Sequence, residues 1–162
     1  MEQMKIHYCI VGCTKMNEKF FTNTITIYNK KQDESFQRTI INKVYARKNR
    51  KIVVNSNGEE VASSETIIIP TKIATINNQL AINSYINNRS LDKNSSILNF
   101  TLNSASIDTP WTIMAGDYIV DGYCDLDFDI TKIKKEHKLF QIISFADNRK
   151  GNLQHFKIEV SE

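Results

Sequence analysis

An Asn-Gly pair at positions 57 and 58 separates two runs of β-forming residues and constrains the fold more than any other feature of the chain. Such a pair suits the two positive-φ positions of a type I′ turn, whose twist matches that of adjoining strands. The run KIVV at 51–54 precedes the pair, and the run TIII at 66–69 follows it and is closed by Pro70. The pattern therefore predicts a long β-hairpin.

Further runs with β character lie on both sides of this hairpin. Residues 24–28 alternate polar and apolar side chains, as a half-buried strand does, and residues 36–54 carry β-branched residues with basic residues between them. The unbroken isoleucines at 67–69 predict a strand that is buried on both faces or crosses between two sheets. Runs at 139–145 and 153–160 predict a terminal hairpin around a polar turn. The fold class is therefore mainly β.

Length and composition predict one globular domain, since the 162 residues are 41% hydrophobic and 24% charged. Residues 1–21 are expected to form an N-terminal arm or short element, and residues 22–160 the single domain. Asparagines crowd residues 75–109, which predicts a long loop with short elements. Asp129 is placed to cap one short helix near residues 129–138.

The sequence predicts neither a cofactor nor a metal site. Three cysteines without C-x-x-C spacing argue against a disulfide framework and fit a reducing cytoplasm. The histidines do not provide the usual zinc-ligand spacing. These residues are Cys9, Cys13, Cys124, His7, His137 and His155. No stretch is long enough for a membrane span, and the N-terminus lacks the features of a signal peptide.

His155 is the strongest candidate for acid–base chemistry, because it follows a polar segment with Asp147 and Arg149. A general base needs a positioned partner and a cleft, and a cross-strand histidine is the simpler interpretation. The motifs G-x-S-x-G and H-E-x-x-H, phosphate loops and dinucleotide fingerprints are absent from the sequence. We therefore expect a protein that is not an enzyme, and a small hydrolase is the weakest alternative.

Two charged segments are candidates for contact with a partner. The acidic patch comprises Asp121, Asp125, Asp127 and Asp129, and the basic run comprises Arg47, Lys48, Arg50 and Lys51. The acidic patch does not match a calcium loop, since Ile130 stands where glycine is required, and a solvated turn is favoured. Strand alternation would place the basic residues on two faces. They either protect a solvated edge or contact a partner or DNA.

Three segments occur in an order that resembles a known family. TITIYNKK begins the β region, AGDYIVDGYCDLDF precedes the expected helix, and FQIISFADNRKGNLQHFKIEV closes the chain. This order resembles the small neck proteins (stopper-type head–tail connector or minor capsid proteins) of tailed bacteriophages of Gram-positive hosts. In that family the segments "TxTxYN", "GDYIVxG" and "TDNR-G…HxKV" recur. The family often has an aromatic "SW" after the second strand, where this chain has Val44-Tyr45-Ala46.

The resemblance implies a small antiparallel β-barrel with long loops that forms a homo-oligomeric ring in the virion neck, after synthesis in the host cytoplasm. The expected partners are a portal or adaptor ring on the head side and a tail terminator or tail tube on the tail side. DNA would pass through the channel, which the ring helps to close, without sequence-specific binding.

Under the resemblance, the acidic patch and the basic run are the candidate opposite faces of one subunit contact. The alternative is a monomeric nucleic-acid-binding β-barrel that uses the basic run and Tyr45, with strongly salt-dependent affinity.

Overall fold

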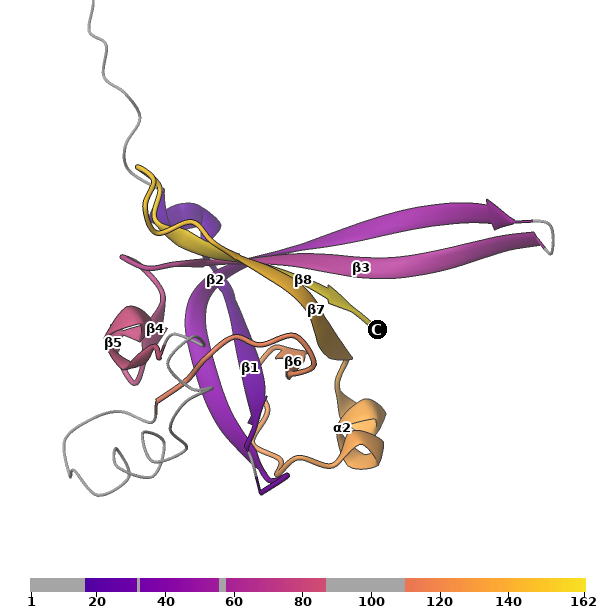
Figure 1. The fold of residues 1–162 in the computed structure, drawn as a ribbon, viewed down its shortest axis with the longest axis horizontal. Helices are drawn as coiled ribbons and strands as arrows, with labels where there is room; N and C mark the ends of the chain where they lie inside the picture. Colours follow the sequence, from indigo (N-terminus) through magenta and orange to yellow (C-terminus); the bar gives the residue numbers. More distant parts are fainter. Residues whose placement is uncertain (1–16, 32, 56–57, 87–109) are drawn as a thin grey trace, which may run out of the picture.

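A computed structural model describes residues 17–31, 33–55, 58–86 and 110–162, and describes residues 49–55 and 58–63 by their backbone alone. The strands are β1 (Asn23–Lys30), β2 (Phe36–Asn55), β3 (Gly58–Pro70), β4 (Thr75–Ile76), β5 (Gln79–Leu80), β6 (Tyr118–Asp121), β7 (Leu139–Asp147) and β8 (His155–Ser161). The helical segments are η1 (Glu18–Phe20), η2 (Ala81–Ser84) and α2 (Ile130–Glu136) (Figure 1).

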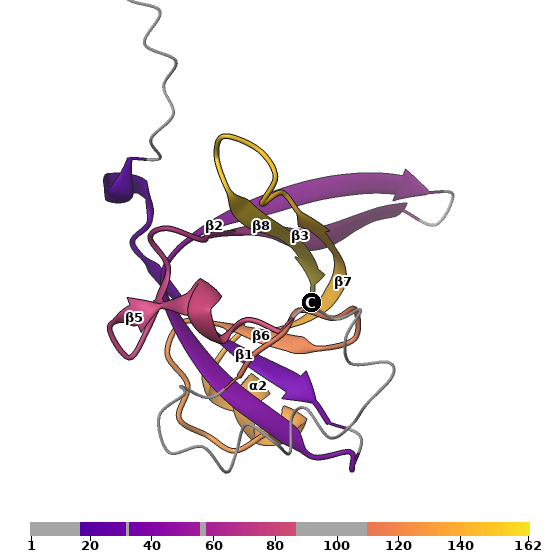
Figure 2. The ribbon, with the colours of Figure 1, turned by 60° about the vertical axis from the view of Figure 1, so that its left-hand side comes forward.

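Six of the strands close into an antiparallel barrel. They follow the order β1-β6-β7-β8-β3-β2, and β2 pairs back onto β1. Figure 2 shows the strands curving around a common interior. The short β4–β5 hairpin joins β2 at the pair Asn42↔Thr75. The predicted fold class, a mainly β chain with a small antiparallel barrel, is confirmed.

The barrel interior is filled by alternate side chains of the six strands, as expected for a barrel of so few strands. Its buried strand residues are Ile25, Ile27, Ile41, Val44, Ile67, Ile69, Ile119, Phe140, Ile142, Phe156, Ile158 and Val160. Trp111 and Ile113, which precede β6, join the same core. The interior is thus an apolar core.

The first strand differs from its prediction, because Ile25–Asn29 are all buried and both faces of β1 are covered. Ile25 and Ile27 face the barrel core, while Tyr28 belongs to a second core with Ile133 of α2. The expectation of a half-buried strand was wrong. The helix that covers the outer face lies about a hundred residues away in the sequence, so local alternation does not reveal it.

The third strand corrects a second prediction. Ile67 and Ile69 are buried, but Ile68 between them is only partly buried. The strand therefore has one buried face, and the expectation of two-sided burial or a crossing between sheets was wrong. Ile68 points outward because β3 stays within one wall of the barrel, between β2 and β8.

The predicted long hairpin is confirmed, since β2 and β3 pair continuously from Tyr45↔Ile68 to Asn55↔Gly58. Gly58 pairs with Asn55 and belongs to β3, so its predicted place within the turn was wrong. The two intervening residues, 56 and 57, lie outside the described part of the chain. Pro70 ends β3 as expected.

The remaining predictions of secondary structure hold where the chain is described. α2 begins after Asp129, as predicted, and is the single α-helix of the described residues. The Asn77-Asn78 turn, with φ of 49° and 67°, joins β4 to β5, while residues 87–109 of the predicted Asn-rich loop lie outside the description. The short η1 segment fits the expected N-terminal element. None of the described helices has the length and apolarity needed to cross a membrane.

Candidate subunit-contact site

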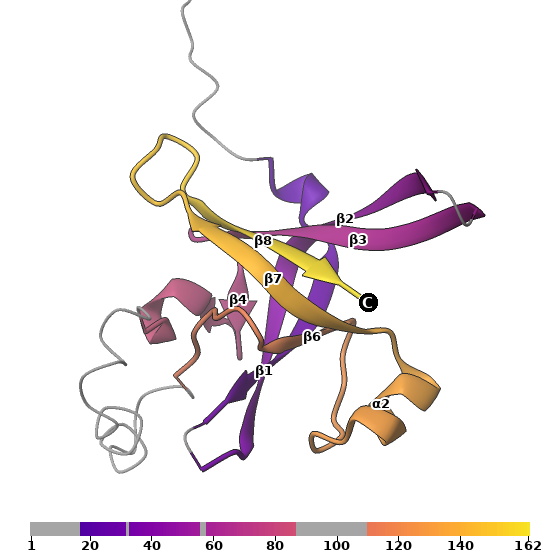
Figure 3. The same cartoon turned by 45° about the vertical axis from the view of Figure 1, so that its right-hand side comes forward.

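The hairpin of β2 and β3 extends well beyond the barrel. β1 pairs with β2 only as far as Asn23↔Val44, and β8 pairs with β3 only from Ser64↔Ser161. Beyond those points, among the residues that the structure describes, the two strands pair only with each other, and we call residues 49–55 and 58–63 the β-arm. The β-arm stands clear of the barrel (Figures 1 and 3). The seven β2 residues of the β-arm span about 20 Å at the usual rise per residue.

A bulge in β2 marks the place where the strand separates from β1. Asn23 pairs with Val44 and Thr24 with Asn42, which leaves Lys43 as the extra residue, with a φ of 60°. A bulge bends a strand and increases its local twist. It therefore lets one continuous strand serve first as barrel wall and then as one side of the β-arm.

The β-arm is an unusual feature to find on an isolated chain. A two-stranded ribbon is marginally stable in water, and each of its outer edges presents unpaired backbone N–H and C=O groups. In the described residues, β2 carries no strand on its outer edge beyond Val44. Such an edge is a ready template for another strand. The β-arm is therefore the part of the molecule most suited to contact a partner.

At the root of the β-arm the structure brings the basic run and the acidic patch together. The Nζ atom of Lys48 lies 3.4 Å from Oδ2 of Asp121, which ends β6. These side chains are 62% and 27% exposed, so the pair contributes at most about 1 kcal/mol. The two residues were predicted to meet across a subunit boundary, and here they meet within one chain.

A buried carboxylate completes this root. Glu65 lies opposite Lys48 in the register, is only 2% exposed, and neither of its oxygens has a hydrogen-bond partner in the described residues. Burial raises the pKa of Glu65, the neighbouring Asp121 raises it further, and Lys48 and Lys138 act in the opposite direction. Sequence reasoning missed Glu65, although it shares the inward parity of Ile67 and Ile69.

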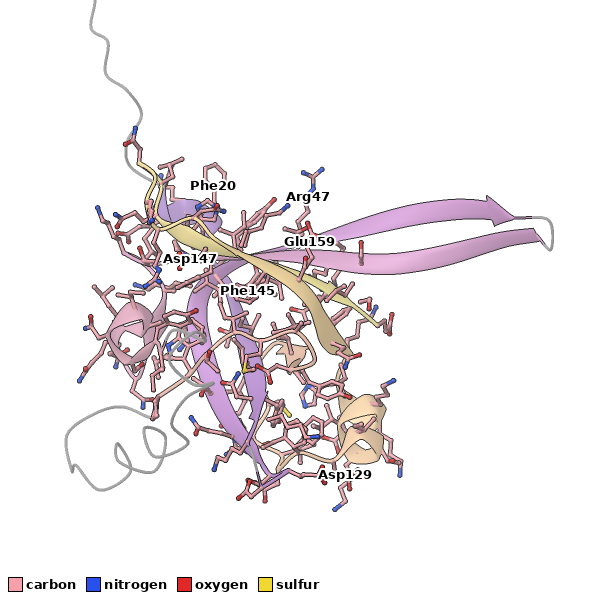
Figure 4. The ribbon with its side chains drawn as sticks, in the orientation of Figure 1. Phe20, Arg47, Asp129, Phe145, Asp147 and Glu159 are labelled. Atoms are coloured by element: carbon pink, nitrogen blue, oxygen red, sulfur yellow. The ribbon has the colours of Figure 1, made fainter. Side chains whose placement is uncertain are left out.

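The other members of the basic run divide between the barrel and the β-arm. Arg47 is exposed on the barrel part of β2 (Figure 4), and the adjacent Lys48 reaches Asp121. Consecutive residues of a strand point to opposite faces, so the predicted division of the charges over two faces holds for this pair. Arg50 and Lys51 lie on the β-arm, where the structure describes the backbone alone.

The rest of the acidic patch forms an exposed turn that leads into α2. Asp125 and Asp127 are exposed, and the backbone carbonyl of Asp125 accepts a hydrogen bond from Arg38. Among the described residues, no group of three His, Cys, Asp or Glu side chains is arranged to hold a metal ion. The structure therefore does not gather Asp121, Asp125 and Asp127 into a single ligand set.

Asp129→Ala is expected to lower the free energy of unfolding, because it removes the N-cap of α2. The Asp129 carboxylate accepts hydrogen bonds from the backbone N–H groups of Thr131 and Lys132, at 2.9 and 3.1 Å. Urea unfolding measures the loss. Asp127→Ala is the matched control and should change stability by less than half as much, whereas equal effects would contradict the capping role.

The first motif of the resemblance, TITIYNKK, covers most of β1 and hydrogen-bonds to the second motif, AGDYIVDGYCDLDF. The Thr26 hydroxyl donates to the Gly122 carbonyl at 2.9 Å and accepts from the Cys124 N–H at 3.0 Å. The Tyr28 hydroxyl donates to the Leu126 carbonyl at 2.8 Å. The TITIYN segment therefore holds the chain that follows β6 against the outside of the barrel.

Asp117 of the second motif precedes β6 and binds the C-terminal end of β1. Its buried carboxylate accepts from the Asn29 side-chain amide at 2.7 Å and from the backbone N–H groups of Lys30 and Met114 at 3.0 and 3.1 Å. Burial nevertheless raises the pKa of Asp117. Gly116, with a φ of 95°, supplies the turn that precedes it. These motif residues support the fold.

The closing motif also has a structural role. Arg149 forms a bidentate pair with Asp147, in which Nε donates to Oδ1 and Nη2 donates to Oδ2. The Arg149 guanidinium also lies 5.2 Å from the ring centroids of both Tyr85 and Phe156. His155, which begins β8, has Nδ1 2.6 Å from the Leu153 carbonyl and Nε2 3.1 Å from the Asn148 amide. The segment is the predicted terminal hairpin, with these side chains stabilising its turn.

Comparison with known proteins places the chain in a family without a known activity. Residues 20–161 match the model of a family of unknown function, DUF6751. No curated protein and no solved structure matches the chain.

Proposed function

The chain belongs to DUF6751, a family of unknown function, and we propose that it is a structural subunit that joins copies of itself into a ring in the neck of a tailed bacteriophage. The ring would lie between the portal or adaptor and the tail and help to close the DNA channel. The resemblance of three ordered segments supports the neck assignment. The observation that carries the self-association is the β-arm.

The division of the molecule between a closed barrel and a projecting β-arm supports a structural role. The interior of the barrel is an apolar core, so the surfaces available for recognition are on its outside. Within the described part of the chain the β-arm has two unpaired edges. Copies of one chain that contact each other front to back close into a ring when the rotation allows it. A packed barrel with a β-arm that can pair with another strand therefore suits a component of an assembly.

The nucleic-acid-binding alternative receives less support. Such a protein needs a stripe of free basic side chains that follows the phosphate backbone. Lys48 instead pairs with Asp121 in the same chain, and Glu65 adds a second carboxylate to the same place. If this alternative were correct, the isolated chain would bind single-stranded DNA, and the affinity would fall steeply as the salt concentration rises.

Shortening the β-arm is expected to abolish self-association and to leave the barrel folded. Replacing residues 50–63 by Asn-Gly joins Asn49 to Ser64, which lie opposite each other in the register, and keeps every pair between β3 and β8. The full chain should sediment as multiples of 18.7 kDa at high concentration, and the shortened variant as a monomer. Sedimentation velocity over a concentration series makes the measurement.

Circular dichroism and thermal unfolding of the shortened variant serve as the folding control. A full chain that stays monomeric up to its solubility limit would contradict the proposed ring. A monomer that binds single-stranded DNA with steep salt dependence would favour the nucleic-acid alternative. Self-association of the shortened variant equal to that of the full chain would show that the β-arm is not the contact.

A further inference from the structure

We infer that the β2 edge of one β-arm pairs with the β3 edge of the β-arm on the next copy, so that the arms of a ring form one continuous antiparallel sheet. This inference rests on the proposed ring and names the partner of the β-arm, a second copy of the chain. It follows from two properties of the β-arm, its open edges and the distribution of its charges.

Both edges of the β-arm are open over similar lengths. Among the described residues, β2 has no strand on its outer side from Tyr45 to Asn55, and β3 has none on its outer side from Gly58 to Ser63. Each edge therefore presents unpaired backbone groups over six residues or more. A closed set of edges would satisfy these groups in every copy, as the closure of a barrel does within one chain.

The charges of the β-arm are separated by strand. Every charged residue of β2 from Tyr45 onward is basic, and both charged residues of β3 from Gly58 to Ser63 are acidic. They are Arg47, Lys48, Arg50, Lys51, Glu59 and Glu60. Pairing two β2 edges or two β3 edges would set like charges against each other, whereas pairing β2 with β3 joins opposite charges. The charges thus favour a front-to-back contact over a two-fold contact.

Strand direction agrees with this arrangement. In a ring, all β-arms point the same way along the axis, with β2 running toward the tip and β3 running back from it. The β2 strand of one copy and the β3 strand of its neighbour are then antiparallel. Antiparallel is also the direction in which β2 and β3 pair within each copy. The contact therefore repeats the antiparallel direction that the chain already adopts, in a different register that brings the basic residues of β2 beside the acidic residues of the neighbouring β3.

Charge exchange between the two strands tests the inference. R50E/K51E makes residues 49–63 of the β-arm wholly acidic, and E59K/E60K makes them wholly basic. Within one β-arm these residues face Ser63, Ala62, Val54 and Val53, so neither variant sets like charges directly opposite each other. Each variant alone should lose the ring. A 1:1 mixture should regain a ring of alternating copies, and so should the variant that carries all four substitutions.

K72E/K150E is the matched control, since it replaces two exposed cations away from the β-arm and should retain the ring. Native mass spectrometry with one copy carrying a mass tag distinguishes mixed from uniform rings. If both single-strand variants form rings like the full chain, the inference is wrong while the proposed function stands. If neither the mixture nor the fourfold variant regains a ring, the inference is also wrong. A native chain that never associates contradicts the proposed function itself.

Discussion

Trp111→Ala is expected to lower the free energy of unfolding by about 3–5 kcal/mol, the range seen when a large aromatic side chain is removed from a packed core. Trp111 is 1% exposed, and its indole N–H donates to the Ala81 carbonyl at 2.7 Å. The ring lies edge-on to Tyr85 and Phe156, with centroids 5.0 and 6.0 Å away. The substitution leaves a cavity and removes the hydrogen-bond donor to Ala81 at the same time.

Urea unfolding followed by circular dichroism measures this loss, because Trp111 is the single tryptophan of the chain and the variant has no indole fluorescence. Trp111→Phe is the control, since it keeps most of the apolar contact but lacks the N–H donor. Its loss should be clearly smaller than that of the alanine variant. A loss below about 1 kcal/mol for Trp111→Ala would mean that the segment around it is not part of the cooperative core.

The alternation of polar and apolar residues predicted the burial of a strand correctly where only one face of that strand is buried. The alternation in β8 matches its burial, because Phe156, Ile158 and Val160 face the core. The same reasoning failed for β1, where Thr26 and Tyr28 are buried by residues that follow β6. A period of two in the sequence indicates that one face of a strand is buried. It does not indicate whether a segment distant in the sequence covers the other face.

The hairpin was predictable and the β-arm was not. An Asn-Gly pair between β-forming runs indicates that two strands pair, which depends on neighbouring residues alone. That β2 and β3 extend beyond their neighbours depends on where the pairing with β1 and β8 stops, at the pairs Asn23↔Val44 and Ser64↔Ser161. Strand ends are set by the whole sheet, so the length of the free ribbon is a property of the fold.

The candidate site was likewise predictable in part, since its charged segments are visible in the sequence and their contacts are not. The basic run and the acidic patch stand out as charged segments, but the contact between Lys48 and Asp121 requires β2 and β6 to reach the same end of the barrel. Glu65 stands out only after Ile67 and Ile69 are known to point inward. Its signal in the sequence is a charged residue at the parity of a buried face, which is interpretable once the register is fixed.

The motifs behind the resemblance bear on fold more directly than on function. Thr26, Tyr28 and Asn29 of the first segment bind the chain on either side of β6, and Asp117 of the second segment accepts from β1 and the adjoining turn. These hydrogen bonds hold the segments before and after β6 against β1, so the motif residues stabilise the barrel and the chain that covers its outside. Function depends on the sites that a fold presents, so the tests of the neck assignment belong on the β-arm.

Replacing Glu65 by leucine is expected to stabilise the protein at neutral pH by about 1–3 kcal/mol, the usual cost of a buried polar group without a hydrogen bond. The carboxylate is buried at the root of the β-arm and both oxygens lack a partner in the described residues. Leucine at the same position would extend the buried face that Ile67 and Ile69 form in β3. The gain should appear in urea unfolding of the otherwise native chain.

The pH dependence of this gain identifies its cause. Because the pKa of Glu65 is raised above its ordinary value of 4.5 in the folded chain, the folded state binds more protons than the unfolded state between those two values. The native chain therefore loses stability through Glu65 as the pH rises through this window. The advantage of Glu65→Leu should accordingly be smallest below pH 4.5 and greatest at neutral pH.

Glu159 on the outer face of β8 provides the opposite control. Lys157 beside it lowers the pKa of Glu159, so its contribution to stability is present above the ordinary value of 4.5 and is lost as the pH falls through the lowered value. Glu159→Gln should thus remove stability at neutral pH and none in strong acid. A Glu65→Leu advantage that does not change with pH would mean that the carboxylate charge is not what destabilises the root of the β-arm.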